Sequence, residues 1–358
     1  MNPRLIIELK KLAHNGRFLA ELCNKNGITV TAVTKVFCAE KPIIEALSSL
    51  PIDYLGDSRL ENIESYPNDI PQKTMLLRLP SPSAAERVVK TCDISLNSEL
   101  ITLAKLSEAA EKLGKQHGVL LMIDLGDLRE GIYHNNDVLL NQTVEYVLSQ
   151  KNLILEGFGT NLTCYGSVLP TTDNLSMLTE KVEGLRKRYS VDAPIISGGN
   201  SSSLYLIGKN RIPKGINNLR FGEAIARGKE TAFGETYPGL CEDVVTLEAE
   251  IIEIAEKPSY PEGQINVNAF GESVNYIDKG IHKRAILAVG RQDTVYEDLV
   301  CLTPGIEIIG ASSDHLIVDI SNSETPLAVG DCLGFSLSYG AMLAGFTSKY
   351  VQKVYISN

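Results

Sequence analysis

A single lysine, Lys35, ends a run of β-branched and apolar residues that begins at Ile28. The alternation from Thr29 to Thr34 is typical of a strand, and helical patterns over 9–26 and 40–50 flank it. Barrels and doubly wound folds place their chemistry at the carboxyl ends of such strands. Desolvation there would lower the pKa of the amine, which suits a group that must form an imine. The alternative is a strand-end lysine whose ammonium extends into solvent.

A second stretch, 195–203, joins an apolar strand to two glycines, Asn200 and three serines. Glycines let the backbone approach a ligand, and serine hydroxyls with exposed N–H groups form a nest for an anion. A further strand end, 219–222, carries Arg220 and a glycine. Two such strand ends together are the pattern of barrel phosphate sites. An ordinary N-capped turn remains the alternative for the serine stretch.

A third stretch runs from an apolar strand that ends at Asp124 into a loop that contains Asp127, Arg129 and Gly131. A charged, glycine-punctuated loop after a buried strand suits an active site. The alternative is that these charges pair with one another at the surface.

The elements that must position these residues alternate between strand and helix over residues 9–230. Helical patterns separate most of the strand candidates, for example over 82–91, 98–114, 136–149 and 173–189. This rhythm predicts an α/β chain with an N-terminal (β/α)8 TIM-like barrel, and a doubly wound sheet is the structural alternative. The strand candidates are 29–34, 54–56, 74–79, 94–96, 119–124, 153–160, 194–197 and 218–221.

The pattern changes after about residue 230. Strand-like segments separated by Gly, Pro and Asp turns predict a C-terminal β-rich domain over 231–358, which the N-terminal strand 1–8 joins. No amphipathic helix is expected there. The strand candidates are 244–255, 285–289, 307–309, 316–320 and 334–338.

The composition narrows the class of protein. The formal net charge of −10 argues against nucleic acid or an anionic membrane as the main partner. No apolar run approaches the roughly 18 residues of a membrane helix, and the first residues lack the pattern of a signal peptide. The seven cysteines are scattered without a CxxC pair, so no metal site is expected. These features predict a cytoplasmic protein with reduced thiols.

An imine-forming lysine, a phosphate nest and a strand-end arginine, in a barrel followed by a β domain, resemble the pyridoxal-phosphate enzymes of the alanine racemase type (fold type III). The resemblance spans nearly the whole chain and is closest to the ornithine racemase branch of these amino-acid racemases. Each motif alone is weak, whereas their order and spacing together are fairly specific. The stretches that carry the resemblance are 32–35, 56–59, 95–98, 124–131, 290–293 and 310–315.

The resemblance implies roles for individual residues. Lys35 would hold pyridoxal 5'-phosphate as an imine and act as one base. Arg129 would lie near the phenolic oxygen of the cofactor and the substrate carboxylate. Arg220 would face the pyridine nitrogen and, because a guanidinium keeps its proton, leave that nitrogen unprotonated. The phosphate would be held by Asn200, Ser201, Tyr339 and the backbone around Gly222 and Glu223.

The chain also departs from the alanine racemases. Their second base is a tyrosine from the partner subunit, and Arg291 stands at that position here. Arginine is a poor base, because its pKa is above about 12. His315 has a suitable ordinary pKa of about 6.5, although a lone histidine is more often structural. The candidates for a replacement base are Asp293, Ser312, Ser313, Asp314 and His315. Asn161 replaces a histidine that stacks on the cofactor ring, and Ala39 replaces a phosphate-contacting tyrosine.

The resemblance thus implies a racemase that interconverts L- and D-amino acids, with a basic substrate such as ornithine or lysine. It also implies a homodimer whose site is shared between the chains. One alternative is a non-catalytic pyridoxal-phosphate carrier, although such carriers lack a β domain. Another is a decarboxylase or an aldolase on the same scaffold. Decarboxylases of this type carry a Cys-Glu pair, whereas Cys301 is followed by Leu302 here.

Overall fold

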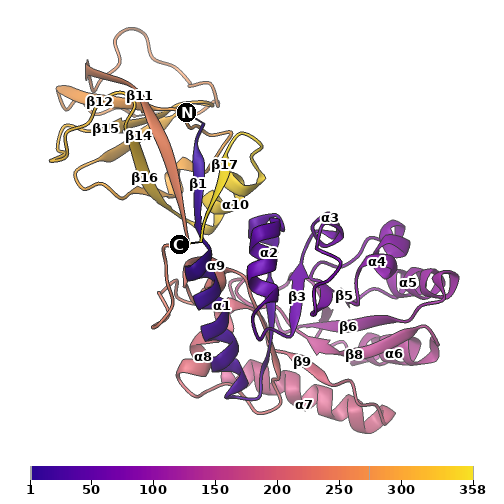
Figure 1. The fold of residues 1–358 in the computed structure, drawn as a ribbon. Coiled ribbons are helices and arrows are strands. Elements are labelled where there is room, and N and C mark those ends of the chain that lie inside the picture. Colours follow the sequence, from indigo (N-terminus) through magenta and orange to yellow (C-terminus); the bar gives the residue numbers. More distant parts are fainter. Residues whose placement is uncertain (1, 274, 358) are drawn as a thin grey trace. The chain divides into compact units, whose positions relative to one another are not determined.

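The computed structural model describes residues 2–273 and 275–357. The chain divides into two compact units (Figure 1). Lys10–Glu242 form the first, which we call the barrel unit. Met1–Leu9 and Asp243–Asn358 form the second, which we call the β-rich unit.

Eight parallel strands close into a barrel in the barrel unit. Their order is β5–β4–β3–β2–β10–β9–β8–β6, and pairing of β5 with β6 closes the ring. The predicted (β/α)8 barrel is therefore confirmed, and the doubly wound alternative is excluded. The strands are β2 (Thr29–Val33), β3 (Tyr54–Asp57), β4 (Lys73–Leu76), β5 (Ile94–Asn97), β6 (His117–Asp124), β8 (Leu153–Gly159), β9 (Ile195–Ser197) and β10 (Asn218–Phe221).

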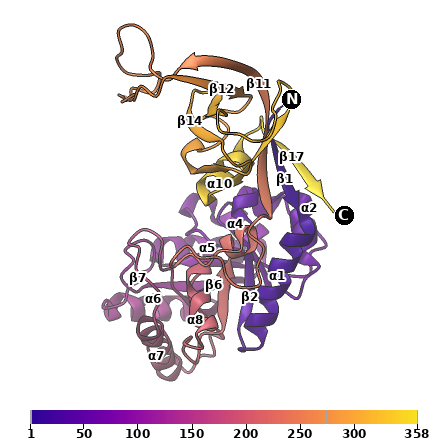
Figure 2. The same cartoon turned by 90° about the vertical axis from the view of Figure 1, so that its left-hand side faces the viewer.

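Helices follow the strands and cover the outside of the barrel (Figures 1 and 2). A short strand that the sequence analysis did not predict, β7 (Ile132–Tyr133), pairs with the end of β6 outside the ring. Three 3₁₀ turns lie at Lys35–Phe37, Pro82–Ala84 and Ser201–Ser203. The helices are α1 (Leu9–Asn24), α2 (Lys41–Ser48), α3 (Leu60–Glu64), α4 (Ala85–Thr91), α5 (Leu100–Leu113), α6 (Asp137–Ser149), α7 (Thr172–Tyr189), α8 (Leu204–Gly208) and α9 (Glu223–Arg227).

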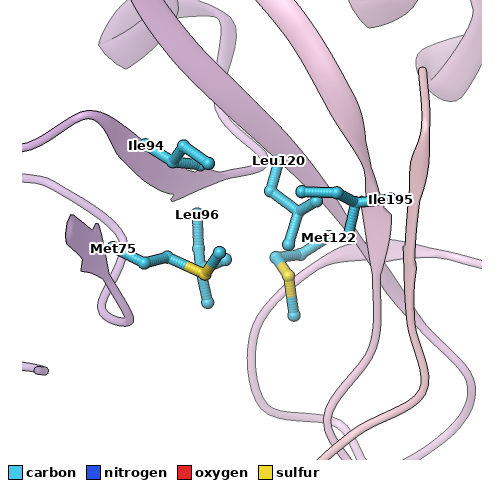
Figure 3. Packing of buried hydrophobic residues seen from close by; sticks show 6 residues of the cluster. All are labelled: Met75, Ile94, Leu96, Leu120, Met122 and Ile195. Atoms are coloured by element: carbon cyan, nitrogen blue, oxygen red, sulfur yellow. The ribbon is translucent and has the colours of Figure 1, made fainter. Parts of the chain in front are cut away.

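The barrel interior is filled by apolar side chains from several strands. In Figure 3, side chains from β4, β5, β6 and β9 converge on one another. Alternate residues of one strand point to the same side, which is why Ile94 and Leu96, two residues apart on β5, both contribute. Burial of each such side chain stabilises the fold by about 1.5–3 kcal/mol. The cluster consists of Met75, Ile94, Leu96, Leu120, Met122 and Ile195.

The β-rich unit is built on antiparallel pairs in the order β13–β16–β11–β12–β15–β14. The N-terminal strand β1 (Arg4–Glu8) pairs with β11 in antiparallel fashion and with the C-terminal strand β17 (Gln352–Ile356) in parallel. The predicted β-rich C-terminal part is confirmed. The remaining strands are β11 (Val245–Pro258), β12 (Ile281–Leu287), β13 (Leu299–Cys301), β14 (Glu307–Ala311), β15 (Leu316–Asp319) and β16 (Cys332–Leu337).

The sequence analysis expected no amphipathic helix in this unit, and the structure has a helix there of another kind, α10 (Tyr339–Thr347), which follows β16. Its residues are apolar on nearly every side, so the segment lacks the polar face that marks an amphipathic helix. Ser338 caps it by accepting the backbone N–H of Ala341 at 3.1 Å. Among the described residues, no helix combines the length and the apolar character needed to cross a bilayer.

Candidate functional site

Lys35 directly follows β2 and opens a 3₁₀ turn at the carboxyl end of the barrel. Buried contacts fix this turn: Thr34 Oγ1 donates to Asp57 Oδ2 at 2.7 Å and lies 2.6 Å from the Tyr66 hydroxyl oxygen. Cys38 and Ala39 then adopt positive φ angles of 48° and 55°, which turn the chain toward α2.

The Lys35 side chain reaches solvent, yet many protein atoms surround it. Desolvation lowers the pKa of its ammonium, and the positive charge of Arg129 acts in the same direction. Interactions with Cys164, Asp57 and Glu223 oppose the shift. An accessible amine with a lowered pKa is a nucleophile that can form an imine near neutral pH.

The serine stretch follows β9, beside the start of α9 that follows β10. Ser201 is buried, and its hydroxyl accepts the backbone N–H of Ala224 at 3.2 Å, so the two predicted anion-binding stretches meet. Asn200 caps the 3₁₀ turn by accepting Ser202 N at 2.9 Å, and its Nδ2 donates to the Leu162 carbonyl at 3.0 Å. The serine stretch is therefore an N-capped turn, and the two glycines before it leave its backbone accessible to a ligand.

The other two residues predicted around this nest lie at the start of α9. Gly222 is the N-cap, and Glu223 opens the first turn, where backbone N–H groups lack intrahelical acceptors. The Glu223 carboxylate pairs with Arg227 four residues later. A Cβ at position 222 would approach Val33 Cβ to 3.3 Å, so a glycine lets α9 pack close to β2.

Arg220 lies on β10 and is almost completely buried. Its guanidinium donates to Ser197 Oγ, to the Thr160 carbonyl at 2.7 Å and to Asn161 Oδ1 at 2.6 Å. Burial lowers its pKa to about 10, so the group still carries its charge at neutral pH. The guanidinium is thus a fixed cation that spans the ends of β8, β9 and β10.

Arg129 lies in the loop after β6 and is paired with its neighbour Glu130. The Glu130 carboxylate accepts from Arg129 Nε and, at 2.6 Å, from Arg129 Nη2. These hydrogen bonds raise the pKa of Arg129. Glu130 also accepts from Nδ2 of Asn161, which brings the predicted Arg129 and Asn161 into one network. The charged loop therefore reaches the interior site, and its charges do not merely pair at the surface.

Sequence analysis missed two residues of this site. Glu130 could have been found, because it lies between Arg129 and Gly131 in a stretch already noted. Cys164 carries no local signal, since only folding brings its Sγ within 3.6 Å of Asn200 Nδ2 and close to Lys35. Burial and neighbouring carboxylates raise the pKa of this thiol, although Arg129 opposes the shift.

The residues present fit a phosphorylated aldehyde such as pyridoxal phosphate. Two hydroxyl oxygens, Thr160 Oγ1 and Ser202 Oγ, are buried and find no hydrogen-bond partner within the described part of the chain. Such groups are costly unless a ligand or water satisfies them. Together with the amine of Lys35 and two guanidiniums, they offer an imine partner and donors for anionic oxygens.

The second-base candidates of the β-rich unit lie on two turns that contact each other. Arg291 N donates to the Ser312 carbonyl at 2.9 Å, and Gln292 N donates to the Ser313 carbonyl at 3.2 Å. A Cβ at Gly290 would lie 2.2 Å from the Ser313 carbonyl oxygen, so only glycine permits this approach. The turns 290–293 and 312–315, which carry the candidate bases, therefore lie side by side within this unit.

The candidate side chains on these turns differ in availability. Asp293 is buried and accepts from Gly290 N at 3.2 Å and from Ser348 Oγ at 3.1 Å. His315 is exposed, and its Nδ1 lies 3.4 Å from Ser312 Oγ. Ser313 donates to Asp314 at 2.6 Å.

Two further residues named in the sequence analysis lie in the β-rich unit. Tyr339 is half-buried at the first position of α10. Arg291, at the position of the missing tyrosine, contacts Glu272 through two hydrogen bonds of 2.9 Å and stacks on Phe270. A guanidinium held in this way cannot serve as a base.

A parallel barrel with a desolvated lysine and two fixed guanidiniums at its mouth, joined to a β-rich unit, defines the class of pyridoxal-phosphate enzymes of fold type III. The chain belongs to the alanine racemase family, since residues 7–228 match the family model described as "Alanine racemase, N-terminal domain".

Individual relatives agree over the full length of the chain. The chain is 48% identical over 353 residues to the ornithine racemase of Acetoanaerobium sticklandii, and this alignment covers 99% of each chain. It is 36% identical to the lysine racemase of Thermotoga maritima, over 99% of this chain and 98% of that protein. The solved alanine racemase of Clostridium difficile shares the fold at 18% identity, with a TM-score of 0.73 over 100% of this chain and 96% of that one.

A second solved structure is the alanine racemase of Bartonella henselae, which has covalently bound pyridoxal phosphate. It superposes with a TM-score of 0.74 at 16% identity, over 99% of this chain and 100% of that one.

Proposed function

We propose that this chain is a pyridoxal-phosphate-dependent racemase of basic amino acids, with ornithine as the first candidate substrate. One observation carries the proposal: the accessible, desolvated amine of Lys35 lies within electrostatic reach of Arg129 at the mouth of the barrel. The similarity to an ornithine racemase and a lysine racemase supports the choice of a basic side chain. Pyridoxal phosphate, when bound, makes the Cα hydrogen of an amino acid acidic.

Lys35 would hold the cofactor covalently and, once freed by the substrate, move the Cα proton on one face. Its neutral form is the competent base, and desolvation raises the fraction of that form at neutral pH. Arg129 would bind the substrate carboxylate and the phenolic oxygen, because a guanidinium pairs well with anionic oxygens. Arg220 would face the pyridine nitrogen as a permanent donor and so keep that nitrogen unprotonated.

The phosphate would lie against the serine stretch and the start of α9. We propose that Ser201, Ser202 and the backbone of Gly222 and Glu223 contact it, with Tyr339 as a further contact. Asn200 would act by holding the turn in place, because both ends of its amide are already bonded to Ser202 and Leu162. A fixed nest loses little entropy on binding a phosphate.

The second proton would be moved by a group of the β-rich unit. We propose His315, with Ser312 beside it, because its ring is exposed and an imidazole is a common general base in enzymes. Asp293 would instead hold its own turn against the segment after α10, since its carboxylate oxygens accept from Gly290 N and from Ser348 Oγ. Replacement of His315 by asparagine should then slow exchange from one enantiomer more than from the other.

We further propose a cytoplasmic homodimer in which the β-rich unit of one copy completes the site of the other. The resemblance to the alanine racemases, whose second base comes from the partner subunit, supports the dimer. The exposed His315 would then act as a base in the site of the other copy. Within the described part of the chain, no two of the seven cysteines form a disulfide, which suits a reducing compartment. Sedimentation equilibrium would test the dimer, and a monomer with full activity would contradict it.

The test of the function is Cα–H exchange in D₂O, followed by proton NMR on protein with added pyridoxal phosphate. Separate samples would contain L-ornithine, L-lysine, L-alanine, L-serine and L-glutamate, and chiral chromatography would analyse each product. We expect fast exchange and a D-isomer with ornithine, lysine or both, and much slower exchange with the others. A yellow protein that exchanges none of the five would contradict racemisation and favour a cofactor carrier or a decarboxylase.

A further inference from the structure

Glu130 joins the two arginines of the candidate site. Its carboxylate accepts two hydrogen bonds from Arg129 and one from Asn161 Nδ2. Oδ1 of the same Asn161 amide accepts from Arg220 Nη2 at 2.6 Å. An unbroken chain of hydrogen bonds therefore links the loop after β6 to strand β10.

Charge fixes the orientation of the Asn161 amide in this chain. A carboxylate can only accept hydrogen bonds, and a guanidinium can only donate them. The amide must therefore turn Nδ2 toward Glu130 and Oδ1 toward Arg220. A reversed amide would set donor against donor on one side and acceptor against acceptor on the other. A neutral glutamine at position 130 would remove the half of this constraint that Glu130 imposes, because its amide can both donate and accept, and Arg220 alone would then fix the orientation of Asn161.

Glu130 also supplies the countercharge of the site. The direct acceptors of the Arg220 guanidinium are all neutral, and Glu130 is the strongest influence that opposes the lowering of its pKa by burial. Burial disfavours the charge of Glu130 itself, yet Arg129, Asn161 and Arg220 together outweigh it and lower the pKa of the carboxyl below its ordinary value. Glu130 is therefore ionised at neutral pH between two cations.

We propose that Glu130 is a positioning residue that orients Asn161 and Arg220 toward the cofactor ring and balances the charge of Arg129. The inference rests on the function proposed above. It predicts that Glu130 affects the cofactor through two separable routes: the geometry at Arg220 and the electrostatic potential at Lys35.

The test compares Glu130→Gln, Glu130→Asp and Asn161→Ala with the wild type. Two quantities are measured: the affinity of the apoprotein for pyridoxal phosphate, and the midpoint of the pH titration of the visible band of the bound cofactor. Glu156→Gln is the control, because Glu156 is also largely buried and paired with a lysine, Lys73, at 3.8 Å.

We expect Glu130→Gln to weaken cofactor binding by about tenfold or more, because a charged hydrogen-bond network is broken. We also expect its titration midpoint to move to lower pH. Without the Glu130 carboxylate, the positive charge of Arg129 is no longer neutralised and lowers the proton affinity of the nearby Lys35 nitrogen. The other titratable neighbours of Lys35, namely Cys164, Asp57 and Glu223, are unchanged in this variant. Glu130→Asp keeps the charge, so its midpoint should stay close to that of the wild type.

Asn161→Ala separates the two routes and carries the test if Glu130→Gln does not fold. It leaves Arg129 paired with Glu130 but removes the link to Arg220, so affinity should fall while the midpoint stays in place. Unchanged affinity in Asn161→Ala, an unchanged midpoint in Glu130→Gln, or an equal shift in Glu156→Gln would overturn the inference. A wild type that shows no cofactor band would contradict the proposed function as well, whereas an active wild type with unaffected variants would contradict this inference alone.

Discussion

The carboxylate of Asp127 accepts the backbone N–H of Tyr165 at 2.9 Å and so joins the loop after β6 to the loop after β8. It also accepts the N–H of Val168 at 3.0 Å, and its side chain is 1% exposed. The first of these loops carries Arg129 and Glu130, and Asn161 stands at the start of the second. Asp127 therefore fixes the spacing of the hydrogen-bond chain without belonging to it.

Replacement of Asp127 by alanine should lower the free energy of unfolding by about 3 kcal/mol, because buried N–H groups lose their acceptor. Urea denaturation of the apoprotein would measure the loss. Asp192→Ala is the matched control, since Asp192 is exposed and should change stability by less than about 0.5 kcal/mol. Equal stability of the two variants would contradict the tethering role.

Lys35→Ala should remove covalent cofactor binding and lower Cα–H exchange by about a thousandfold or more, because both the imine partner and one base are lost. The visible band and the exchange rate are the readouts. Lys41→Ala removes an exposed lysine that pairs with Glu45 at 3.6 Å, and it should leave both unchanged. Exchange in Lys35→Ala within tenfold of the wild type would exclude Lys35 as the base.

The lowered pKa of Lys35 predicts a pH dependence for the apoprotein. Because desolvation disfavours the ammonium, the neutral amine is present at lower pH than for an ordinary lysine with a pKa of 10.5. The rate of imine formation with pyridoxal phosphate should therefore rise with a midpoint below 10.5, as followed by stopped-flow absorbance. A midpoint at or above that value would show that the site does not activate this amine.

His117, at the start of β6, predicts a loss of stability in acid. Its ring is buried with Nε2 2.8 Å from Ser95 Oγ, and burial lowers its pKa from 6.5 to about 4. Between these values the unfolded chain binds a proton that the folded chain does not. Stability should therefore fall as the pH falls through this window, by about 3 kcal/mol in all.

The measurement for His117 is urea unfolding at several pH values between 7 and about 4. His117→Asn should show a smaller decrease in stability over this range than the wild type. His14→Asn, which changes an exposed histidine, should retain the full decrease. A parallel pH profile for His117→Asn and the wild type would assign the acid sensitivity to other groups.

The backbone of the loop that carries Arg129 should require a glycine at position 131. Its φ is +124°, and a Cβ there would lie 2.7 Å from the backbone nitrogen of Asp124. Gly126 has a similar φ of +112°, but a Cβ there would meet nothing within 4 Å. Gly126→Ala should cost about 1 kcal/mol from φ strain alone, and Gly131→Ala at least about 2 kcal/mol. Equal costs in thermal unfolding would show that the close approach is not a constraint.

The barrel could be predicted from sequence because each buried strand leaves a local signature. The alternation before Lys35 and the apolar run before Asp124 depend only on neighbours in the chain, and the carboxyl ends of parallel strands must meet. Helix α10 was missed for the opposite reason: a helix whose residues are apolar on nearly every side shows no periodic contrast.

The network of the site could not be predicted, because it depends on distant pairs. Glu130 and Asn161 are 31 residues apart, and Asn161 and Arg220 are 59 apart, so no local pattern reports their contact. The raised pKa of the Cys164 thiol likewise follows from burial and from carboxylates elsewhere in the chain. The resemblance named Asn161 and Arg220 singly, but only the fold shows which atom of Asn161 meets which partner.

The pairing of β1 with β11 and β17 has a consequence for the order in which the protein can mature on the ribosome. About 340 residues separate Glu8, which ends β1, from Gln352, which begins β17. At a translation rate of about 5–20 residues per second, β17 is synthesised about 20–70 s after β1, and the whole barrel sequence is synthesised in between. The barrel can close during synthesis, whereas the β-rich sheet is completed only once the last strand has emerged. Until then β1 offers an unpaired edge to any other nascent strand.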